Sequence, residues 1–203
     1  MSFKKLHPLL KEALVAQDMH AAMPLQKTLL PKLKSGINMY VVAKSGTGKT
    51  TALVLATVHK LQAQAKGDSP RALIMVKDKE SGLALKQTFE RFTANTDLRI
   101  YCVHDTSSIE KQKDDIYVGT DIIIATPKRL NKLYFINGIH LGELQILALD
   151  DAHLILQANF QNDVLRVSDS LKKCQYLIFT EVLSAKLKSL EHSMMHHAEL
   201  VVG

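Results

Sequence analysis

The sequence predicts an α/β domain in which a central, mostly parallel sheet is flanked by helices on both faces. Apolar runs rich in β-branched residues alternate along the chain with stretches of helical periodicity, an order typical of parallel strands joined by helices. One run, residues 37–42, leads into a loop of small residues, 43–50, and then into a helix-forming stretch, 51–64. A loop of this kind between a strand and a helix is typical of phosphate binding.

The first two elements are expected to be helices. Apolar residues recur at helical spacing from Leu6 to Val15, and Pro24 can occupy the first turn of a second helix that runs through Leu33. Gly36 suits the end of that helix. The predicted strands are the seven apolar runs 37–42, 72–76, 98–103, 122–125, 146–149, 176–179 and 200–202.

Length and composition predict one globular domain. The chain has 203 residues, of which 46% are hydrophobic and 23% charged, which is enough for one sizeable core. No repeat or low-complexity tract divides it, so residues 1–203 are expected to form a single domain that includes the helical segment 1–36. A net charge of +6 only weakly favours a nucleic-acid partner.

Targeting signals and disulfides are not expected. No apolar run is long enough to span a membrane, and no secretory signal follows the first residues, so we expect a cytoplasmic protein without a membrane partner. Cys102 and Cys174 lie in separate apolar runs without C-x-x-C spacing, which predicts buried thiols.

The loop after the first strand has the chemistry of a phosphate cradle. Small residues let consecutive backbone N–H groups turn around an anion, and the following helix N-terminus adds partial positive charge. Lys49 is expected to reach the β- and γ-phosphates, and the Thr50 hydroxyl to bind Mg²⁺. Ala43 stands where the usual pattern has glycine. The predicted nucleotide contacts are Ala43, Lys44, Ser45, Gly46, Thr47, Gly48, Lys49, Thr50 and Thr51.

A second candidate site follows the apolar run 146–149. Asp150 and Asp151 come directly after it, and ligands bind at the carboxyl ends of strands in open parallel sheets. Asp150 is the candidate Mg²⁺ ligand and Asp151 the candidate base that activates water. The alternative is a solvated acidic turn, but the phosphate loop earlier in the chain favours the magnesium interpretation.

A third signal follows the run 122–125. Thr126 can cap a helix that Pro127 starts, and Lys128 and Arg129 follow in its first turn. Such a helix N-terminus suits a backbone phosphate of a nucleic acid. A plain helix start with solvated basic residues is equally compatible with the spacing.

In this order the motifs resemble the first RecA-like lobe of DEAD-box RNA helicases, within helicase superfamily 2, across essentially the whole chain. The matching segments are the phosphate loop, residues 150–153 at the DEAD position and residues 125–130 at the T-P-G-R-L position. Upstream, residues 3–6 resemble the F-x-x-L opening and residues 23–26 the end of the Q motif.

The resemblance implies ligands as well as a fold. It implies a RecA-like P-loop NTPase domain that binds ATP through Gln26 at the adenine edge, with Lys49, Asp150 and Asp151 in catalysis and Mg²⁺ on Thr50 and Asp150. Single-stranded RNA is the implied partner. Its expected contacts are Lys79, Thr126, Pro127, Lys128 and Arg129.

Several positions depart from the family pattern. Asp151 replaces Glu and has a shorter reach, which can cost about a hundredfold in rate. His153 replaces the last Asp. Residues 180–182 read Thr-Glu-Val where the family has S-A-T, so that Glu181 puts a charge where a methyl is usual. Met19 stands at the aromatic position that stacks on adenine, which predicts weak ATP binding.

The chain also contains no match to the second lobe, which supplies the arginine finger in the family. We therefore expect weak ATP hydrolysis from this chain alone, or a protein partner that supplies a second lobe. The alternative is a non-catalytic, ATP-dependent adaptor that binds RNA or a protein. A P-loop kinase or GTPase would leave Gln26 and residues 126–130 without a role.

The histidines near the C-terminus suggest one further site. His192 and His196 have the i, i+4 spacing that can hold zinc on a helix, with His197 beside them. No third ligand of suitable type is apparent nearby, so a solvated helix end is the favoured interpretation.

Overall fold

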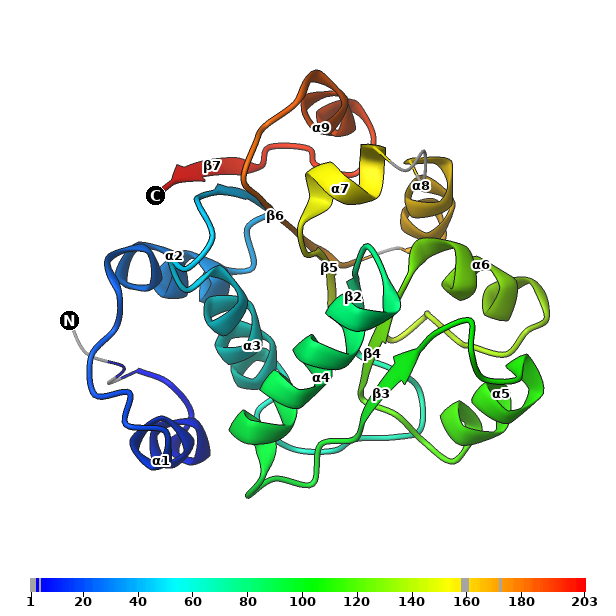
Figure 1. Ribbon diagram of the computed structural model, residues 1–203, viewed down its shortest axis with the longest axis horizontal. Helices are drawn as coiled ribbons and strands as arrows, with labels where there is room; N and C mark the ends of the chain where they lie inside the picture. The colour runs from blue at the N-terminus through cyan, green and yellow to red at the C-terminus, as the bar shows by residue number, and fades with distance from the viewer. Residues whose placement is uncertain (1–2, 4, 158–160, 172) are drawn as a thin grey trace.

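Seven strands form one sheet in the computed structural model, which describes residues 3, 5–157, 161–171 and 173–203 (Figure 1). The order is β3-β4-β2-β5-β6-β1-β7 and each pair of neighbours is parallel. The predicted α/β fold is confirmed, and every predicted run overlaps a strand. The strands are β1 (Met39–Val42), β2 (Ala72–Met75), β3 (Ile100–Val103), β4 (Ile122–Ala125), β5 (Ile146–Leu149), β6 (Gln175–Thr180) and β7 (Glu199–Val202).

The strands read as unbroken apolar runs because both faces of the sheet are covered. Successive side chains point to opposite faces, so Met39 and Val41 of β1 join one core cluster while Tyr40 joins the other. In β2, Ile74 belongs to the first cluster and Met75 to the second. The sheet therefore separates two hydrophobic cores.

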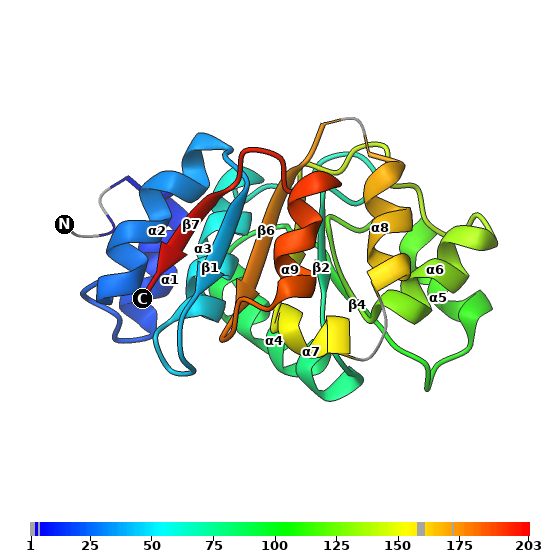
Figure 2. The same ribbon diagram turned by 90° about the horizontal axis from the view of Figure 1, so that it is seen from above.

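Helices build the outer layers. Helices α1 to α4 lie on one side of the strands in Figure 1 and contribute to the first cluster, whereas α5 to α9 contribute to the second. Figure 2 shows α7, α8 and α9 together on one side of the sheet. The helices are α1 (Pro8–Ala16), α2 (Pro24–Ser35), α3 (Lys49–Lys60), α4 (Lys79–Thr93), α5 (Ile109–Tyr117), α6 (Pro127–Phe135), α7 (Ala152–Gln157), α8 (Gln161–Asp169), α9 (Ala185–Ser189) and the 3₁₀ helix η1 (Leu190–His192).

The N-terminal helical segment packs on the first core. Helix α1 contacts α3 and α4, and α2 contacts α3. Phe3 and Leu6 are both buried in the first cluster, and the Leu6 N–H donates to the Phe3 carbonyl over 3.1 Å. Lys4, one of the two residues between Phe3 and Leu6 in the predicted F-x-x-L opening, lies outside the described residues.

Three predicted helix ends, two of α2 and one of α6, can be compared with the structure. Helix α2 starts at Pro24 and ends before Gly36, whose φ of +83° is a left-handed conformation that glycine adopts without strain. Helix α6 starts at Pro127 with Thr126 at the N-cap position, but the Thr126 hydroxyl makes no capping hydrogen bond. The prediction of a side-chain cap from Thr126 was therefore wrong, although the helix boundary was right.

The parallel arrangement brings the carboxyl ends of all seven strands to one edge of the sheet, where the predicted site residues follow β1, β2, β4 and β5.

Cys102 is buried, Cys174 is half-buried, and both thiols are free. Within the described residues, no helix combines the length and the hydropathy needed to cross a membrane.

Candidate nucleotide-binding site

The loop between β1 and α3 has the backbone of an anion cradle. Gly46 and Gly48 have φ angles of +78° and +86°, which side-chain-bearing residues rarely adopt. Gly48 is the N-cap of α3, so the helix N-terminus faces the loop. Ala43 is buried and is not among the described residues with positive φ. An alanine is therefore compatible with the first loop position, where the usual pattern has glycine.

Lys49 is held across the inside of this loop. The residue is only 7% exposed, and its Nζ donates to the carbonyl oxygens of Ala43 and Lys44, the latter over 2.8 Å. A buried ammonium group needs such partners because it has lost its water. The amine therefore already lies where the loop would surround an anion.

Gln26 touches the phosphate loop directly. Its side chain is fully buried, its Nε2 donates to the Gly48 carbonyl over 3.4 Å, and its Oε1 accepts from the Met23 N–H over 3.0 Å. A Cβ at Gly48 would lie 2.6 Å from Gln26 Nε2 and 2.9 Å from Met23 Sδ. The start of α2 and the loop are thus one packed unit. Met19, the predicted adenine contact, packs against the first core cluster.

Asp150 lies beyond the end of β5 in a site that opposes its ionisation. The pKa of the Asp150 carboxyl is raised from 3.8 to about 6, mainly by burial and to a smaller extent by the neighbouring Asp151 carboxylate, while Lys49 and Lys77 act in the opposite direction. Because Lys49 influences Asp150, the loop and the acidic strand end share one electrostatic environment. Strand β6 lies between β5 and β1 in the sheet.

Two ion pairs flank Asp150. Asp151 has a φ of +52°, and its carboxylate lies 4.0 Å from the Lys77 amine. On the other side, the Glu181 carboxylate lies 3.9 Å from the Lys49 amine. Sequence reasoning assigned no role to Lys77 and treated Glu181 only as a departure. Both residues closely follow apolar strands, β2 and β6, which is the signal that could have identified them.

The acidic strand end is also linked to the end of β6. His153 Nδ1 and the Thr180 hydroxyl form a hydrogen bond of 3.0 Å. The same hydroxyl bonds to the carbonyl and, more weakly, to the N–H of Val182. Thr180 is fully buried. These contacts hold the turn at residues 180–182 in a defined position beside the site.

The predicted RNA contacts after β4 do not share one surface. Lys128 is exposed, whereas Arg129 is 6% exposed. The Arg129 guanidinium donates to Gln112 Oε1 over 2.8 Å and to the Ser107 carbonyl, and it lies 3.7 Å from Asp105. In this conformation it therefore holds the segment between β3 and α5.

The remaining predicted contacts border this segment. Pro127 is buried, and the Thr126 hydroxyl is buried without a hydrogen-bond partner among the described residues. Lys79 is half-buried at the start of α4. The pKa of His104, beyond β3, is lowered by burial and by the charges of Lys79 and Arg129, which therefore share its surroundings.

The donor set fits a magnesium ion bound together with phosphate. Mg²⁺ commonly uses one or two carboxylates plus substrate phosphates. Asp150 offers a carboxyl group whose pKa is raised by burial and by Asp151, and a nearby cation would favour its ionised form. Thr50, on the first turn of α3, offers a hydroxyl. In the described ranges, no cluster of three or more His, Cys, Asp or Glu side chains could hold a metal ion by itself.

The C-terminal histidines are not arranged as a helical pair. His192 ends the 3₁₀ helix η1, and His196 and His197 lie beyond it in a turn, with His197 at a φ of +54°. The spacing rule for one helix face therefore does not apply. All three histidines are exposed, as expected for a solvated segment, although only His192 lies at the end of a helix.

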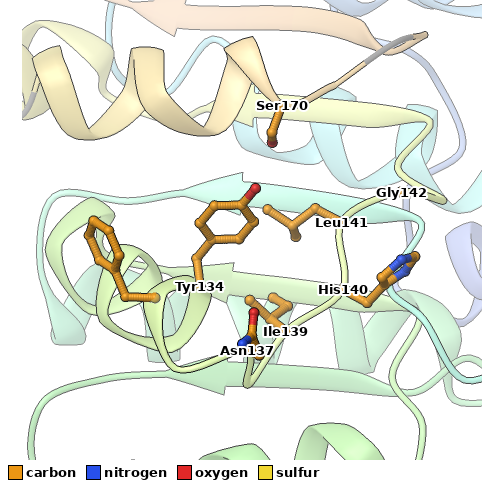
Figure 3. A pocket seen from close by; sticks show the side chains of 8 residues that line it. Tyr134, Asn137, Ile139, His140, Leu141, Gly142 and Ser170 are labelled. Carbon is orange, nitrogen blue, oxygen red and sulfur yellow. The ribbon is translucent and has the colours of Figure 1, made fainter.

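A separate hollow of about 520 Å³ lies between the end of α6 and the connection to β5 (Figure 3). Tyr134, Leu141 and Ser170 are among its lining residues. It is at the amino end of β5, and the phosphate loop is at the opposite edge of the sheet. This hollow therefore lies away from the candidate nucleotide-binding residues.

The fold and the cradle together define a P-loop NTPase domain of RecA-like architecture. The model of the DEAD/DEAH box helicase family matches residues 23–190. The chain belongs to the DEAD/DEAH box helicase family.

Curated relatives and solved structures agree with this assignment. The ATP-dependent RNA helicases RhlB of Pectobacterium atrosepticum and Yersinia pestis are 30% and 31% identical to the chain over 97% of its length. The chain covers 47% and 48% of those proteins. It therefore spans about half the length of the relatives it matches, as expected for one lobe.

Two solved structures share the fold at low sequence identity. A DEAD box protein from the hyperthermophile Methanococcus jannaschii superposes with a TM-score of 0.92 at 18% identity, over all of this chain and 56% of that one. An S. cerevisiae Dbp5 variant, bound to a Gle1 variant and IP6, superposes with a TM-score of 0.89 at 20% identity, over all of this chain and 52% of that one.

Proposed function

We propose that residues 1–203 are the ATP-binding, first RecA-like domain of a helicase, engage single-stranded RNA in the cytoplasm and hydrolyse ATP weakly when alone. The observation that carries the proposal is the contact of Gln26 with the phosphate loop at Gly48. The contact places an amide side chain that can hydrogen-bond to the edge of a base next to a loop that can bind phosphates. Family membership and the relatives named as ATP-dependent RNA helicases support ATP and RNA as ligands.

Each residue has a distinct role in this proposal. Backbone N–H groups of residues 44–50 surround the phosphates, and Thr51 extends the helix N-terminus behind them. Lys49 leaves its carbonyl partners and pairs with the β- and γ-phosphates. Thr50 and Asp150 would hold Mg²⁺, which supplies charge neutralisation at the phosphates. Asp151 accepts a proton from the attacking water.

The RNA proposal depends on an exposed basic residue at a helix N-terminus. Lys128 lies in the first turn of α6 and is exposed, so it can reach a backbone phosphate without rearrangement. Lys79 borders the same edge of the sheet at the start of α4. Arg129 would join them only after releasing Gln112 and Ser107.

The test is MgATP binding and phosphate release, with and without single-stranded RNA. We expect wild-type protein to bind MgATP and to release phosphate faster with RNA, and Lys49→Ala to lose both properties. Lys11→Ala, which removes an exposed lysine from α1, is the matched control and should behave as wild type. Equal phosphate release by wild type and Lys49→Ala in the presence of RNA would contradict the catalytic part.

A second candidate function is a non-catalytic adaptor that binds RNA or a protein in its ATP-bound form. The observation that favours it is the ion pair of Asp151 with Lys77, because this contact occupies the carboxylate that would have to face the attacking water. Measurable multiple turnover that Asp150→Ala abolishes would exclude the adaptor. Faster turnover in Asp151→Glu would show that carboxylate reach limits the natural protein.

The adenine and partner proposals need their own measurements. If Gln26 reads adenine, ATP should bind more tightly than GTP, and Gln26→Ala should reduce that preference. A GTP preference in wild type would instead favour a GTPase. Addition of a separately expressed second RecA-like lobe should raise turnover if a protein partner completes the site.

A further inference from the structure

Glu181 is the one carboxylate that the described part of the chain places within ion-pair distance of Lys49. The distance from Glu181 Oε1 to Lys49 Nζ is 3.9 Å, and the side chains are 41% and 8% exposed. Lys49 is therefore surrounded by three oxygen-bearing groups, the carbonyls of Ala43 and Lys44 and this carboxylate. Of the three, only the carboxylate carries a full negative charge.

The backbone determines where this carboxylate lies. Val42 of β1 is paired with Thr180 of β6, and the Ala43 N–H donates to the Thr180 carbonyl over 3.0 Å. Glu181 is the next residue and therefore lies directly beside the start of the phosphate loop. The hydrogen bonds of the Thr180 hydroxyl to His153 and Val182 fix the turn from both sides. The position of Glu181 is thus built into the sheet.

We propose that Glu181 competes with the phosphates of the nucleotide for Lys49 and so sets the affinity of the site. This inference rests on the proposed function, because it concerns the same loop. A carboxylate beside the lysine pairs with it when the loop is free and repels a polyphosphate that enters. The half-exposed Glu181 side chain can turn toward solvent when nucleotide binds, so the competition weakens binding without blocking it.

The test compares MgATP affinity in wild type, Glu181→Gln and Glu181→Ala, measured by titration calorimetry. Both variants remove the charge, and Gln retains the shape. We expect both to lower the dissociation constant about three- to tenfold, because partly exposed ion pairs have modest energies. Glu143→Gln is the matched charge control, since Glu143 is exposed near the opposite, amino end of β5, and its affinity should equal that of wild type.

Ionic strength separates an electrostatic role from a structural one. The affinity difference between Glu181→Gln and wild type should shrink as salt is raised, because screening shortens the range of the carboxylate. A difference that is independent of salt, or one seen only in Glu181→Ala, would show a packing effect and overturn the proposal. Weaker MgATP binding in Glu181→Gln would also overturn it and would indicate instead that the carboxylate assists magnesium.

The two proposals fail in distinguishable ways. If wild type binds MgATP, Lys49→Ala does not, and Glu181→Gln binds within twofold of wild type, the competition is absent while the nucleotide site stands. If neither wild type nor Glu181→Gln binds MgATP, the proposed function itself is wrong, and the inference about Glu181 is wrong with it.

Discussion

At the scale of single residues, neighbouring positions in one motif can have opposite environments. Lys128 and Arg129 are adjacent in the sequence and carry the same charge. Lys128 is exposed, while Arg129 is buried and bonded to Gln112 and Ser107. Their substitutions should therefore have different consequences, which allows RNA binding to be measured separately from folding.

Replacement of Arg129 by alanine should lower the free energy of unfolding by about 2–3 kcal/mol, because hydrogen bonds of a charged group are lost and Gln112 is left unsatisfied. Lys128→Ala should change stability by less than about 0.5 kcal/mol. It should instead weaken RNA binding and reduce the salt slope by about one. Urea unfolding and RNA titrations at several salt concentrations test both statements, and equal stability losses would contradict them.

At the scale of elements, the phosphate loop depends on its packing against the start of α2. Gly46 and Gly48 both have positive φ angles, but their surroundings differ. A Cβ at Gly46 would meet no atom of the described residues within 4 Å, whereas a Cβ at Gly48 would meet Gln26 and Met23. The element that precedes the sheet therefore limits which residues the loop accepts.

This difference predicts unequal effects of two alanine substitutions. Each should cost roughly 1–2 kcal/mol of stability from backbone strain. Gly48→Ala should cost more than that and weaken MgATP binding at least about tenfold, because it displaces Gln26 and alters the helix N-terminus. Urea unfolding and nucleotide titration provide the measurements. Identical losses of stability and affinity in the two variants would show that the contact with Gln26 is unimportant.

At the scale of the whole molecule, the two edges of the sheet have different roles. The carboxyl edge contains the candidate site, and the amino edge contains an ionic cluster around a buried carboxylate. Asp121, just before β4, is fully buried and receives hydrogen bonds from Arg71 and Arg99, including one of 2.6 Å from Arg71. These residues precede β4, β2 and β3, so the cluster joins the starts of three strands.

Asp121 should make stability depend on acid pH. Burial alone raises the pKa of Asp121, but hydrogen bonds from Arg99 and Arg71 outweigh it and hold the pKa below 3.8. A lowered pKa means that the stabilisation is complete above about pH 4 and is lost as pH falls through the folded-state value. Asp121→Asn should cost about 3–5 kcal/mol at pH 7 and flatten the acid decline. The midpoints of urea unfolding, measured from neutral to acid pH, test both expectations. Asp114→Asn, which changes an exposed carboxylate, is the control.

The sequence by itself determined the fold class, the seven strand-bearing runs and the family, because these depend on local patterns. An apolar run buried on both faces remains recognisable without its neighbours, and the phosphate loop has a fixed spacing from Gly46 to Thr50. The roles assigned to those residues remain predictions for the experiments described above.

Only the tertiary structure decided which charges meet. Lys77 and Asp151 are 74 residues apart in the sequence, and Lys49 and Glu181 are 132 residues apart. The strand order brings the charged groups of the first pair to 4.0 Å and those of the second pair to 3.9 Å. The burial of Arg129 and the contact of Gln26 with Gly48 likewise depend on packing between distant segments. Strand order and packing depend on contacts between segments that are distant in the sequence, so no local sequence pattern predicts them.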